Sequence, residues 1–383
     1  SIEAVLRKSN YRIERAISGE IAIEKISQIN FDCILLDVQM PDMDGFEVAE
    51  IVKNNEDTQN IPVIFMTALS TEKKNIIKGF KVGAVEYMHK PLDPDILKIK
   101  VETFSQLYKQ KKELAKAHGE TKKAMTLLEN HSNEVNASMR YAKNIQNTIF
   151  PSEETFKTIF PDSFVFHMPK DIVGGDFYWL SVTEEKTVLA CVDCTGHGIP
   201  GALLTMVGGS LLKQSVEVKK LLTPSLILND MRQGLKSTFN QNNLSGRIGD
   251  GMEISICVFD FKTNVLEFSG AGRPLLIVKK GVSSCVFQES IGLSHDTPDD
   301  ITFVDYTFSL KKGDCVYLFS DGYADQFGGV SSKRFMKKKL LKTLSAMTHQ
   351  NMLAQKDNLV NIFNDWKGEE PQVDDILVIG IKI

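Results

Sequence analysis

The chain has 383 residues and a formal net charge of −4 at pH 7. This length predicts two or three domains with cores of their own, and the acidic balance argues against a protein that coats nucleic acid or a membrane surface. The apolar runs have the length of strands, far below the ~20 residues that cross a bilayer. No signal-peptide pattern opens the sequence, so we expect a cytoplasmic protein.

Residues 1–102 alternate between helical and strand patterns, as a doubly wound α/β sheet requires. In chain order we expect a helix over Ile2–Arg7, a strand over Tyr11–Ala16, a helix over Glu20–Gln28, strand Phe31–Leu36, helix Phe46–Lys53, strand Val63–Met66, helix Lys73–Val82, strand Val85–His89 and the start of a last helix over Asp95–Phe104.

Three polar residues close strands of this expected sheet. Asp37 directly follows the strand Phe31–Leu36, at the sheet edge where chemistry gathers in open α/β folds. Thr67 closes the next strand, and Lys90 follows the last one and precedes Pro91. A hydroxyl and a cation at neighbouring strand ends can both reach a phosphoryl group on Asp37.

At Asp37, Thr67, Tyr87 and Lys90 the sequence resembles the receiver domain of bacterial response regulators. The resemblance implies that a histidine kinase supplies the phosphoryl group to Asp37, and that Thr67, Tyr87 and Lys90 take part in the switch. It also implies Mg²⁺ beside the phosphorylated carboxylate, held in part by paired acidic residues after the first strand. The resemblance therefore implies an N-terminally truncated domain, because this sequence starts after that strand and a parallel sheet without a central strand exposes ladder groups. The sequence as given cannot complete the Mg²⁺ site.

Residues 103–149 predict a helical linker whose alternating steps of three and four residues never break. One half of this register is nearly all apolar, which indicates a coiled-coil seam and favours a parallel homodimer over a solitary solvated helix. The lysines of this segment then form a solvated face rather than a nucleic-acid site. The nearly apolar half of the seam comprises Leu107, Leu114, Thr121, Leu128, Val135, Ala142 and Ile149, and its polar interruptions include Lys111, His118, Ser132 and Gln146.

Residues 150–383 alternate short strands with Gly-rich turns, which predicts an α+β domain with two stacked sheets and helices outside. The CxxC spacing of Cys191 and Cys194 is typical of a redox or zinc site, but no second CxxC follows and a buried thiol is favoured for Cys191. We expect strands over Val188–Asp193, Glu253–Phe259, Val265–Ser269, Leu275–Lys279, Val316–Ser320 and Ile376–Ile383, and helices over Gly201–Val216, Ser225–Asn240, Lys333–Met347 and Asn351–Trp366.

Carboxylates recur at the ends of these strands. Asp176 follows two glycines, Asp193 and Asp321 follow apolar runs, and Asp374 and Asp375 open the last strand. If these side chains converged they would repel one another, unless divalent cations lay between them. Oxygen ligands suit Mg²⁺ or Mn²⁺, and two such ions can clamp a phosphate. The alternative is that each Asp only caps a turn. That explanation suffices for a single Asp, but it explains less well why several occur in such similar settings.

These motifs resemble the metal-dependent PPM-type serine/threonine phosphatases of the SpoIIE/RsbU-like bacterial branch. The resemblance implies that Asp193 bridges two Mn²⁺ or Mg²⁺ ions, followed by the Cys194 carbonyl as a ligand. Asp321 and Asp374 should bind one ion, and Asp176 should bind directly or through water. Asp375 is the alternative ligand if the last ligand lies one position later than Asp374. The motifs are Gly174-Gly175-Asp176-Phe177, Asp193-x-Thr-Gly-His-Gly-Ile-Pro-Gly-Ala202, Asp250-Gly-Met252, Ser320-Asp-Gly-Tyr-Ala-Asp325 and Asp374-Asp375.

Four further residues have open roles. His197 is a candidate general acid or a turn cap, and Lys170 is a candidate phosphate ligand or a surface lysine. Asp250 either lies near the metals or orders a loop. Arg273 departs from the family pattern, and we expect it to alter substrate contacts without touching the metals.

Together these parts predict a receiver (1–102), a coiled-coil linker (103–149) and a phosphatase domain (150–383). The resemblance implies a phosphorylated STAS-domain anti-sigma-factor antagonist as the substrate, in a partner-switching pathway. The alternative is a non-catalytic adaptor that binds a partner under receiver control, against which the retained acidic residues argue. We find no helix-turn-helix with a basic recognition helix, so a DNA-binding regulator is not expected.

Overall fold

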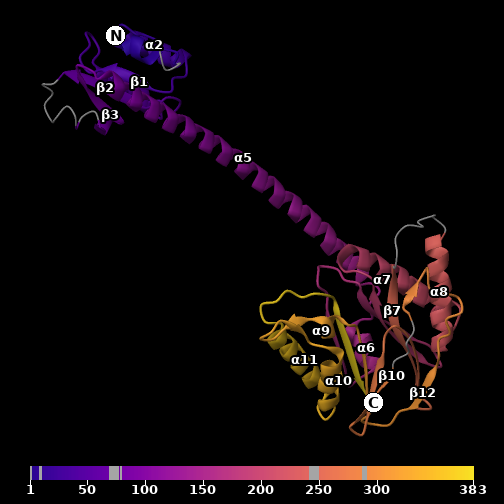
Figure 1. Cartoon of the computed structure of the whole chain (residues 1–383). Helices are drawn as coiled ribbons and strands as arrows, with labels where there is room; N and C mark the ends of the chain where they lie inside the picture. Colours follow the sequence, from indigo (N-terminus) through magenta and orange to yellow (C-terminus); the bar gives the residue numbers. More distant parts are fainter. Residues whose placement is uncertain (1, 8–10, 69–76, 78–79, 241–249, 287–290) are drawn as a thin grey trace. The chain divides into compact units, whose positions relative to one another are not determined.

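The computed structural model describes residues 2–7, 11–68, 77, 80–240, 250–286 and 291–383 (Figure 1). The chain divides into two compact units, Ser1–His131 and Ser132–Ile383. The expected helix Lys73–Val82 lies largely outside the described residues. Each unit is taken by itself below.

The first unit contains a parallel sheet of three strands in the order β1-β2-β3, counted over the described residues. The strand predicted over Tyr11–Ala16 is wrong: its residues are described but belong to no strand, because no described neighbour pairs with them. The elements of this unit are α1 (Ile2–Arg7), α2 (Gly19–Gln28), β1 (Ile34–Asp37), α3 (Gly45–Asn54), β2 (Val63–Ala68), β3 (Glu86–Lys90) and the start of α5 (Pro94–Gln146).

Strand β2 separates two apolar clusters, because its successive side chains alternate between the faces of the sheet. Val63 and Phe65 pack with Phe46 and Val48 of α3 on one face. On the other face Ile64 packs with a cluster that includes Leu97 and Val101 of α5. Helices therefore cover both faces, as predicted for a doubly wound sheet.

Helix α5 runs without a break for 53 residues, so the last receiver helix and the predicted linker form one element (Figure 1). Several apolar residues of the predicted seam are exposed on it, among them Leu114 and Leu128 at 71% and 69%. Gln146 is different, because it is buried and bonded within the second unit. Ile149 also packs against a core cluster there, so the seam ends before these two residues.

The second unit is built of two stacked antiparallel sheets between two helical layers (Figure 1). Over the described residues one sheet has the order β10-β9-β13-β16-β4, and the other has the order β12-β8-β7-β6-β5 with β11 beside β7. The first sheet comprises β4 (Ser163–Met168), β9 (Leu275–Lys279), β10 (Val282–Val286), β13 (Cys315–Phe319) and β16 (Ile376–Lys382). The second comprises β5 (Asp176–Val182), β6 (Thr187–Cys194), β7 (Gly251–Asp260), β8 (Val265–Ala271), β11 (Leu293–Ser294) and β12 (Tyr306–Ser309).

Three apolar clusters hold these four layers together. The central one lies between the sheets and joins Leu189 and Phe259 to Val316 and Ile379. The outer ones seat α7 (Gly198–Lys213) and α8 (Pro224–Asn240) on one sheet, and α10 (Lys337–Ala346) and α11 (Met352–Lys367) on the other. The remaining elements are α6 (Glu153–Ile159), a π-helix (Gln214–Val218), α9 (Gly322–Asp325), β14 (Phe327–Gly328) and β15 (Lys333–Arg334). The predicted α+β sandwich is confirmed.

The helix predicted to start at Lys333 begins four residues later. Lys333 and Arg334 instead pair with β14 as the short strand β15. Met336 has φ = 77°, a left-handed conformation that rarely occurs within a helix, and α10 starts only after it. The apolar spacing correctly predicted a helix in this segment, but the backbone conformation of Met336 places its first residue at Lys337.

Candidate active site

Two neighbouring strands place the first pair of carboxylates opposite each other. Asp176 at the start of β5 is the direct cross-strand partner of Asp193 near the end of β6. The turn before β5 needs glycine, because a Cβ on Gly175 would lie 2.6 Å from the Gly196 carbonyl oxygen and 2.9 Å from that of Cys194. The Gly-Gly-Asp motif thus serves the close approach of two backbone segments.

The other sheet contributes the second pair. Asp321 follows β13 and Asp374 precedes β16, and these two strands are antiparallel neighbours. Ser320 connects the sheets: its hydroxyl donates to Asp176 Oδ2 at 2.5 Å and accepts from the Leu377 amide at 3.0 Å. Carboxylates from distant parts of the chain therefore converge at one end of the sandwich.

A guanidinium lies among these carboxylates. Arg273, which is 8% exposed, contacts Asp193 Oδ2 through one terminal nitrogen, and the same nitrogen is 3.0 Å from Asp321 Oδ2. Its Nε lies 2.9 Å from Glu253 Oε2, an ion pair in which the N–H is not aimed at the oxygen. The expectation that Arg273 stays clear of the predicted metal ligands is wrong, since it contacts two of them.

These neighbouring carboxylates raise one another's pKa. Burial raises the pKa of Asp193 to about 7 against the opposing effect of Arg273, and the carboxylates of Asp321 and Asp374 add to the rise. Burial, and then the charge of Asp193, also raises the pKa of Asp176 well above its usual value. Like charges held together in this way require a cation.

Oxygen donors surround a cation here, which is the chemistry that Mg²⁺ and Mn²⁺ select. In this arrangement no three histidine, cysteine or acidic side chains of the described residues are grouped closely enough to hold an ion. The Arg273 guanidinium instead neutralises Asp193 and Asp321. The donor set therefore fits divalent ions, provided that the guanidinium moves away.

Asp375 has a different environment from its neighbour Asp374. It is 3% exposed, and its two oxygens accept from the backbone amides of Lys170 and Gly175 at 2.7 and 2.6 Å. Asp374 is exposed at the cluster, and burial and the nearby Asp321 raise its pKa. Asp375 therefore holds the loop before β5 in place, and Asp374 is the better placed of the two for an ion.

His197 and Lys170 meet at the exposed side of the cluster. The His197 ring contacts Asp171 Oδ2 at 2.8 Å through Nδ1, and Lys170 Nζ at 2.9 Å through Nε2. His197 also caps α7 by position, but its side chain makes no cap hydrogen bond. Asp171 was not singled out from the sequence, where only its position beside Lys170 could have drawn attention to it.

Two other predictions concern neighbouring residues. Cys191 and Cys194 belong to different apolar clusters on opposite faces of the sheet, and burial raises the pKa of both thiols. The buried-thiol interpretation is confirmed. Asp250 is exposed just before β7, where the Gly251 carbonyl accepts from the Thr195 amide at 2.9 Å.

The receiver unit places its predicted residues at the carboxyl edge of its sheet. Lys90 Nζ forms an ion pair with Asp37 Oδ2 at the ends of β3 and β1. Thr67 is buried on β2, and the buried Tyr87 ring packs 5.2 Å from Phe65 between ring centroids. The structure therefore brings a carboxylate, a hydroxyl-bearing strand and a cation together as predicted.

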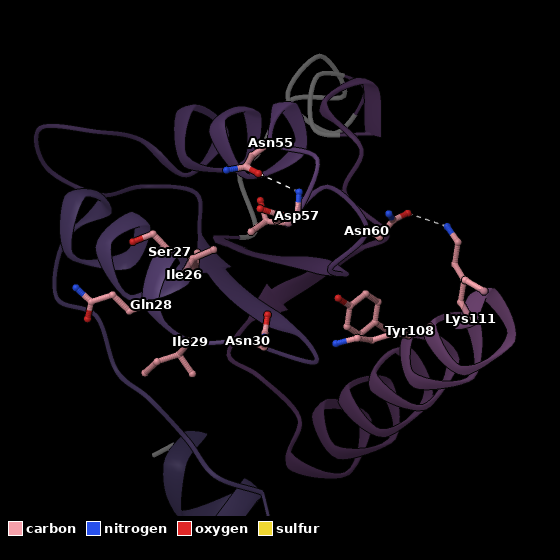
Figure 2. A pocket seen from close by; sticks show the side chains of 13 residues that line it. Ile26, Ser27, Gln28, Ile29, Asn30, Asn55, Asp57, Asn60, Tyr108 and Lys111 are labelled. Atoms are coloured by element: carbon pink, nitrogen blue, oxygen red, sulfur yellow. Dashed lines mark hydrogen bonds between the residues drawn. The ribbon is translucent and has the colours of Figure 1, made fainter. Parts of the chain in front are cut away.

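A cavity of about 580 Å³ opens at the other end of this sheet (Figure 2). Asn30 and Asn60, which precede β1 and β2, line it together with Tyr108 of α5, and Lys111 Nζ donates to Asn60 Oδ1 at 2.9 Å. Asp37 lies at the opposite end of β1. This cavity is therefore separate from the phosphorylation chemistry that the sequence predicts.

Residues 183–383 match the family model of stage II sporulation protein E (SpoIIE), and residues 1–102 match that of the response regulator receiver domain. The chain belongs to the SpoIIE family. Its second unit is similar to the SiaA-PP2C domain of Pseudomonas aeruginosa, at 25% identity and a TM-score of 0.60 over 66% of this chain and 98% of that one. A receiver domain is thus joined to a PP2C-type phosphatase domain.

Curated relatives match about a quarter of the chain. A probable cyclic di-GMP phosphodiesterase of Vibrio cholerae is 44% identical over 25% of this chain and 22% of its own length. The transcriptional regulatory protein ResD of Bacillus subtilis is 39% identical over 23% of this chain and 35% of its own length. The chain thus spans about a fifth to a third of these relatives. Among the described residues, the helices are too short or too polar to cross a bilayer.

Proposed function

We propose that this chain is a metal-dependent phosphoprotein serine/threonine phosphatase whose activity is controlled by its receiver. One observation carries the phosphatase part: Asp193 and Asp321, from separate sheets, bind a single cationic group. Acidic side chains from distant segments do not collect around a positive charge in order to cap turns. The family to which the chain belongs supports the same chemistry.

The ligands that we propose are Asp193 as the bridge between two Mn²⁺ or Mg²⁺ ions, with the Cys194 carbonyl, Asp321 and Asp374 beside it. Asp176, which lies opposite Asp193, would bind directly or through water. When bound, the ions supply Lewis acidity, which activates water and neutralises phosphate charge. Asp375 is a positioning residue, since both of its oxygens already accept backbone hydrogen bonds.

Lys170 and His197 would handle the substrate at the exposed side of this cluster. The Lys170 ammonium donates to His197 Nε2, so the ring keeps its proton on Nδ1, facing Asp171. A phosphate dianion would draw Lys170 away as its new partner. Nε2 would then be free to take up a proton from solvent water and deliver it to the leaving serine or threonine oxygen, with Asp171 stabilising the imidazolium.

The receiver would control this reaction through Asp37. A cognate histidine kinase would phosphorylate Asp37, where Lys90 already pairs with the carboxylate, with Mg²⁺ bound in the intact domain. Thr67 and Tyr87 would respond by repacking the face on which they lie. Both side chains are buried on β2 and β3, in the same sheet as β1, which carries Asp37, and this position supports the proposed role.

We further propose that α5 forms a parallel coiled-coil dimer. Leu107, Leu114 and Leu128 are more than half exposed on one seam, and water-exposed leucines at this spacing gain by pairing with a second helix. A Leu114→Glu, Leu128→Glu double variant should be monomeric in multi-angle light scattering. A matched change on another face of the helix, Lys116→Glu with Lys123→Glu, should leave the dimer intact; a wild-type monomer would contradict the proposal.

The proposed substrate is a phosphorylated STAS-domain anti-sigma-factor antagonist in a partner-switching pathway. This follows from the family resemblance, and the receiver supports a signalling context. The substrate would present phosphoserine or phosphothreonine to the Lys170 side of the cluster. A purified phosphorylated STAS protein should be dephosphorylated faster than a peptide that contains the same phosphosite.

The decisive experiment is hydrolysis of a phosphopeptide by the full chain with Mn²⁺. Asp193→Ala should lower the rate by roughly a thousandfold, because it removes the proposed bridge. Asp299→Ala is the matched control, since Asp299 is an exposed carboxylate paired with Lys236 and distant in the chain from the cluster. Equal rates for wild type and Asp193→Ala would leave the non-catalytic adaptor as the remaining function.

A further inference from the structure

Arg273 lies in the turn between β8 and β9, next to a residue, Gly272, whose backbone conformation favours glycine. Gly272 has φ = 79°, and a Cβ there would lie 2.8 Å from the Glu253 side chain. A Cβ on Gly270 would lie 2.4 Å from the Arg273 carbonyl oxygen. Both glycines, which precede Arg273, thus keep the link between β8 and β9 tight and fix the point on the backbone from which the Arg273 side chain extends.

The guanidinium contacts the oxygens that we propose would bind a divalent ion. A single nitrogen of Arg273 contacts both Asp193 Oδ2 and Asp321 Oδ2, which are oxygens of two proposed metal ligands. Placing an ion of charge +2 beside this +1 group would set two cations a few ångströms apart in a buried site, where repulsion is strong. Both cannot bind these oxygens at full strength, so one must give way.

The position to which Arg273 would withdraw is also present. Glu253, the cross-strand partner of Asp193, lies on the outer side of the guanidinium with its side chain 45% exposed. It already pairs with Nε at 2.9 Å, although that N–H is not aimed at its oxygen. A small rotation toward Glu253 would improve this contact and release Asp193 and Asp321 together.

Building on the phosphatase function proposed above, we propose that Arg273 is a built-in cation that competes with divalent ions for Asp193 and Asp321, and that Glu253 receives it when an ion binds. Without metal the guanidinium stabilises the fold against repulsion among the carboxylates. With metal, the cost of displacing it lowers the apparent affinity, since only the fraction of molecules with Arg273 withdrawn can bind. The site thereby sets a threshold of metal concentration.

Metal binding tests this directly on the full chain. Mn²⁺ affinity is measured by calorimetry, and melting temperature is measured in EDTA. Arg273→Gln should bind Mn²⁺ at least about fivefold more tightly than wild type, the lower end of ordinary coupling between sites, and should melt at a lower temperature in EDTA. Arg334→Gln is the matched control, because its exposed pair with Asp325 lies outside the cluster.

Unchanged or weaker Mn²⁺ binding by folded Arg273→Gln would overturn the proposal. If that variant does not fold, Arg273→Lys carries the test, with a smaller gain expected because an ammonium spans fewer carboxylates; an unchanged affinity would again overturn it. Glu253→Gln should weaken Mn²⁺ binding in wild type and much less in the Arg273→Gln background. The proposed phosphatase function fails separately, through equal hydrolysis by wild type and Asp193→Ala.

Discussion

Asp37 in the receiver unit and Asp193 in the phosphatase unit both lie at a strand end and both pair with one basic side chain. The side chains of Asp37 and Lys90 are 32% and 43% exposed, whereas those of Asp193 and Arg273 are 20% and 9% exposed. Exposed pairs are solvated and contribute little to stability. Buried pairs cannot lose one partner without a large cost.

This difference in depth fits two kinds of chemistry. Under the proposed function a phosphoryl donor would reach Asp37, so that carboxylate has to be accessible and its partner has to be replaceable at low cost. A cluster that holds divalent ions gains from burial, which strengthens each charge interaction. The comparison predicts a large loss of stability when a side-chain partner is removed in the phosphatase cluster and a small loss when Asp37 loses its side-chain partner, whereas a backbone clash is costly in either unit. The variants below follow in order of decreasing effect.

The largest effect is expected for Asp375→Ala. This buried carboxylate accepts two short backbone hydrogen bonds, so its loss should lower the free energy of unfolding of the phosphatase unit by about 2–4 kcal/mol. Asp374→Ala, one residue away and exposed, is the control and should shift stability much less. Urea unfolding followed by tryptophan fluorescence reports this unit alone, because both tryptophans, Trp179 and Trp366, belong to it. Equal shifts would contradict the positioning role of Asp375.

Gly45→Ala should produce the largest effect in the receiver unit. A Cβ at this position would lie 2.2 Å from the Asp37 carbonyl oxygen, so the loop after β1 must move. Such overpacking costs about 1–3 kcal/mol and should slow phosphorylation of Asp37 by a small phosphoryl donor. Gly119→Ala on α5 is the control: its Cβ meets nothing within 4 Å, and it should stabilise the helix slightly. A receiver that tolerates Gly45→Ala unchanged would show that the loop is looser than described.

Ser320→Ala should have an intermediate effect. Its hydroxyl links Asp176 of one sheet to the Leu377 amide of the other, and removing it leaves a buried carboxylate short of a donor. We expect a loss of about 1–3 kcal/mol in the tryptophan-monitored unfolding of the phosphatase unit. Ser345→Ala, which removes only a hydroxyl bonded to its own helix, should cost less than 1 kcal/mol. Similar losses would show that the link between the sheets is not important.

Much of this site could be predicted from the sequence because several carboxylates follow apolar strands. Asp37, Asp193 and Asp321 were found in this way, and the Gly-Gly-Asp176 motif was found from glycines that permit close backbone approach. Their convergence follows from sheet topology, which places the ends of neighbouring strands together. The order of elements and the stacked sheets followed from the same periodicity.

The sequence did not predict which charges face each other across the sandwich. Arg273 occurs far from Asp193 and Asp321 in the chain, and only the register of β6, β7 and β8 brings it among them. Asp374 and Asp375 are the same residue type at adjacent positions, so the sequence does not distinguish them. Only the fold exposes Asp374, the candidate ligand, and buries Asp375, which holds the backbone of the loop before β5. The strand expected over Tyr11–Ala16 failed for a related reason, since a strand needs a neighbour that local pattern does not provide.

The smallest stability effect is expected for Lys90→Ala. This variant tests most directly whether the Asp37–Lys90 pair contributes less to stability than the buried Asp193–Arg273 pair. The pair with Asp37 is partly exposed to solvent, so its removal should change the free energy of unfolding of the receiver by less than about 1 kcal/mol. Phosphorylation of Asp37 should nevertheless lose its effect on phosphatase rate, because the cation that contacts the new phosphoryl group is gone. Rates are measured with and without the small phosphoryl donor, and Lys109→Ala, which removes another exposed pair, should keep the response. A large loss of receiver stability in Lys90→Ala would mean that the two strand-end pairs do not differ in depth as their exposure indicates.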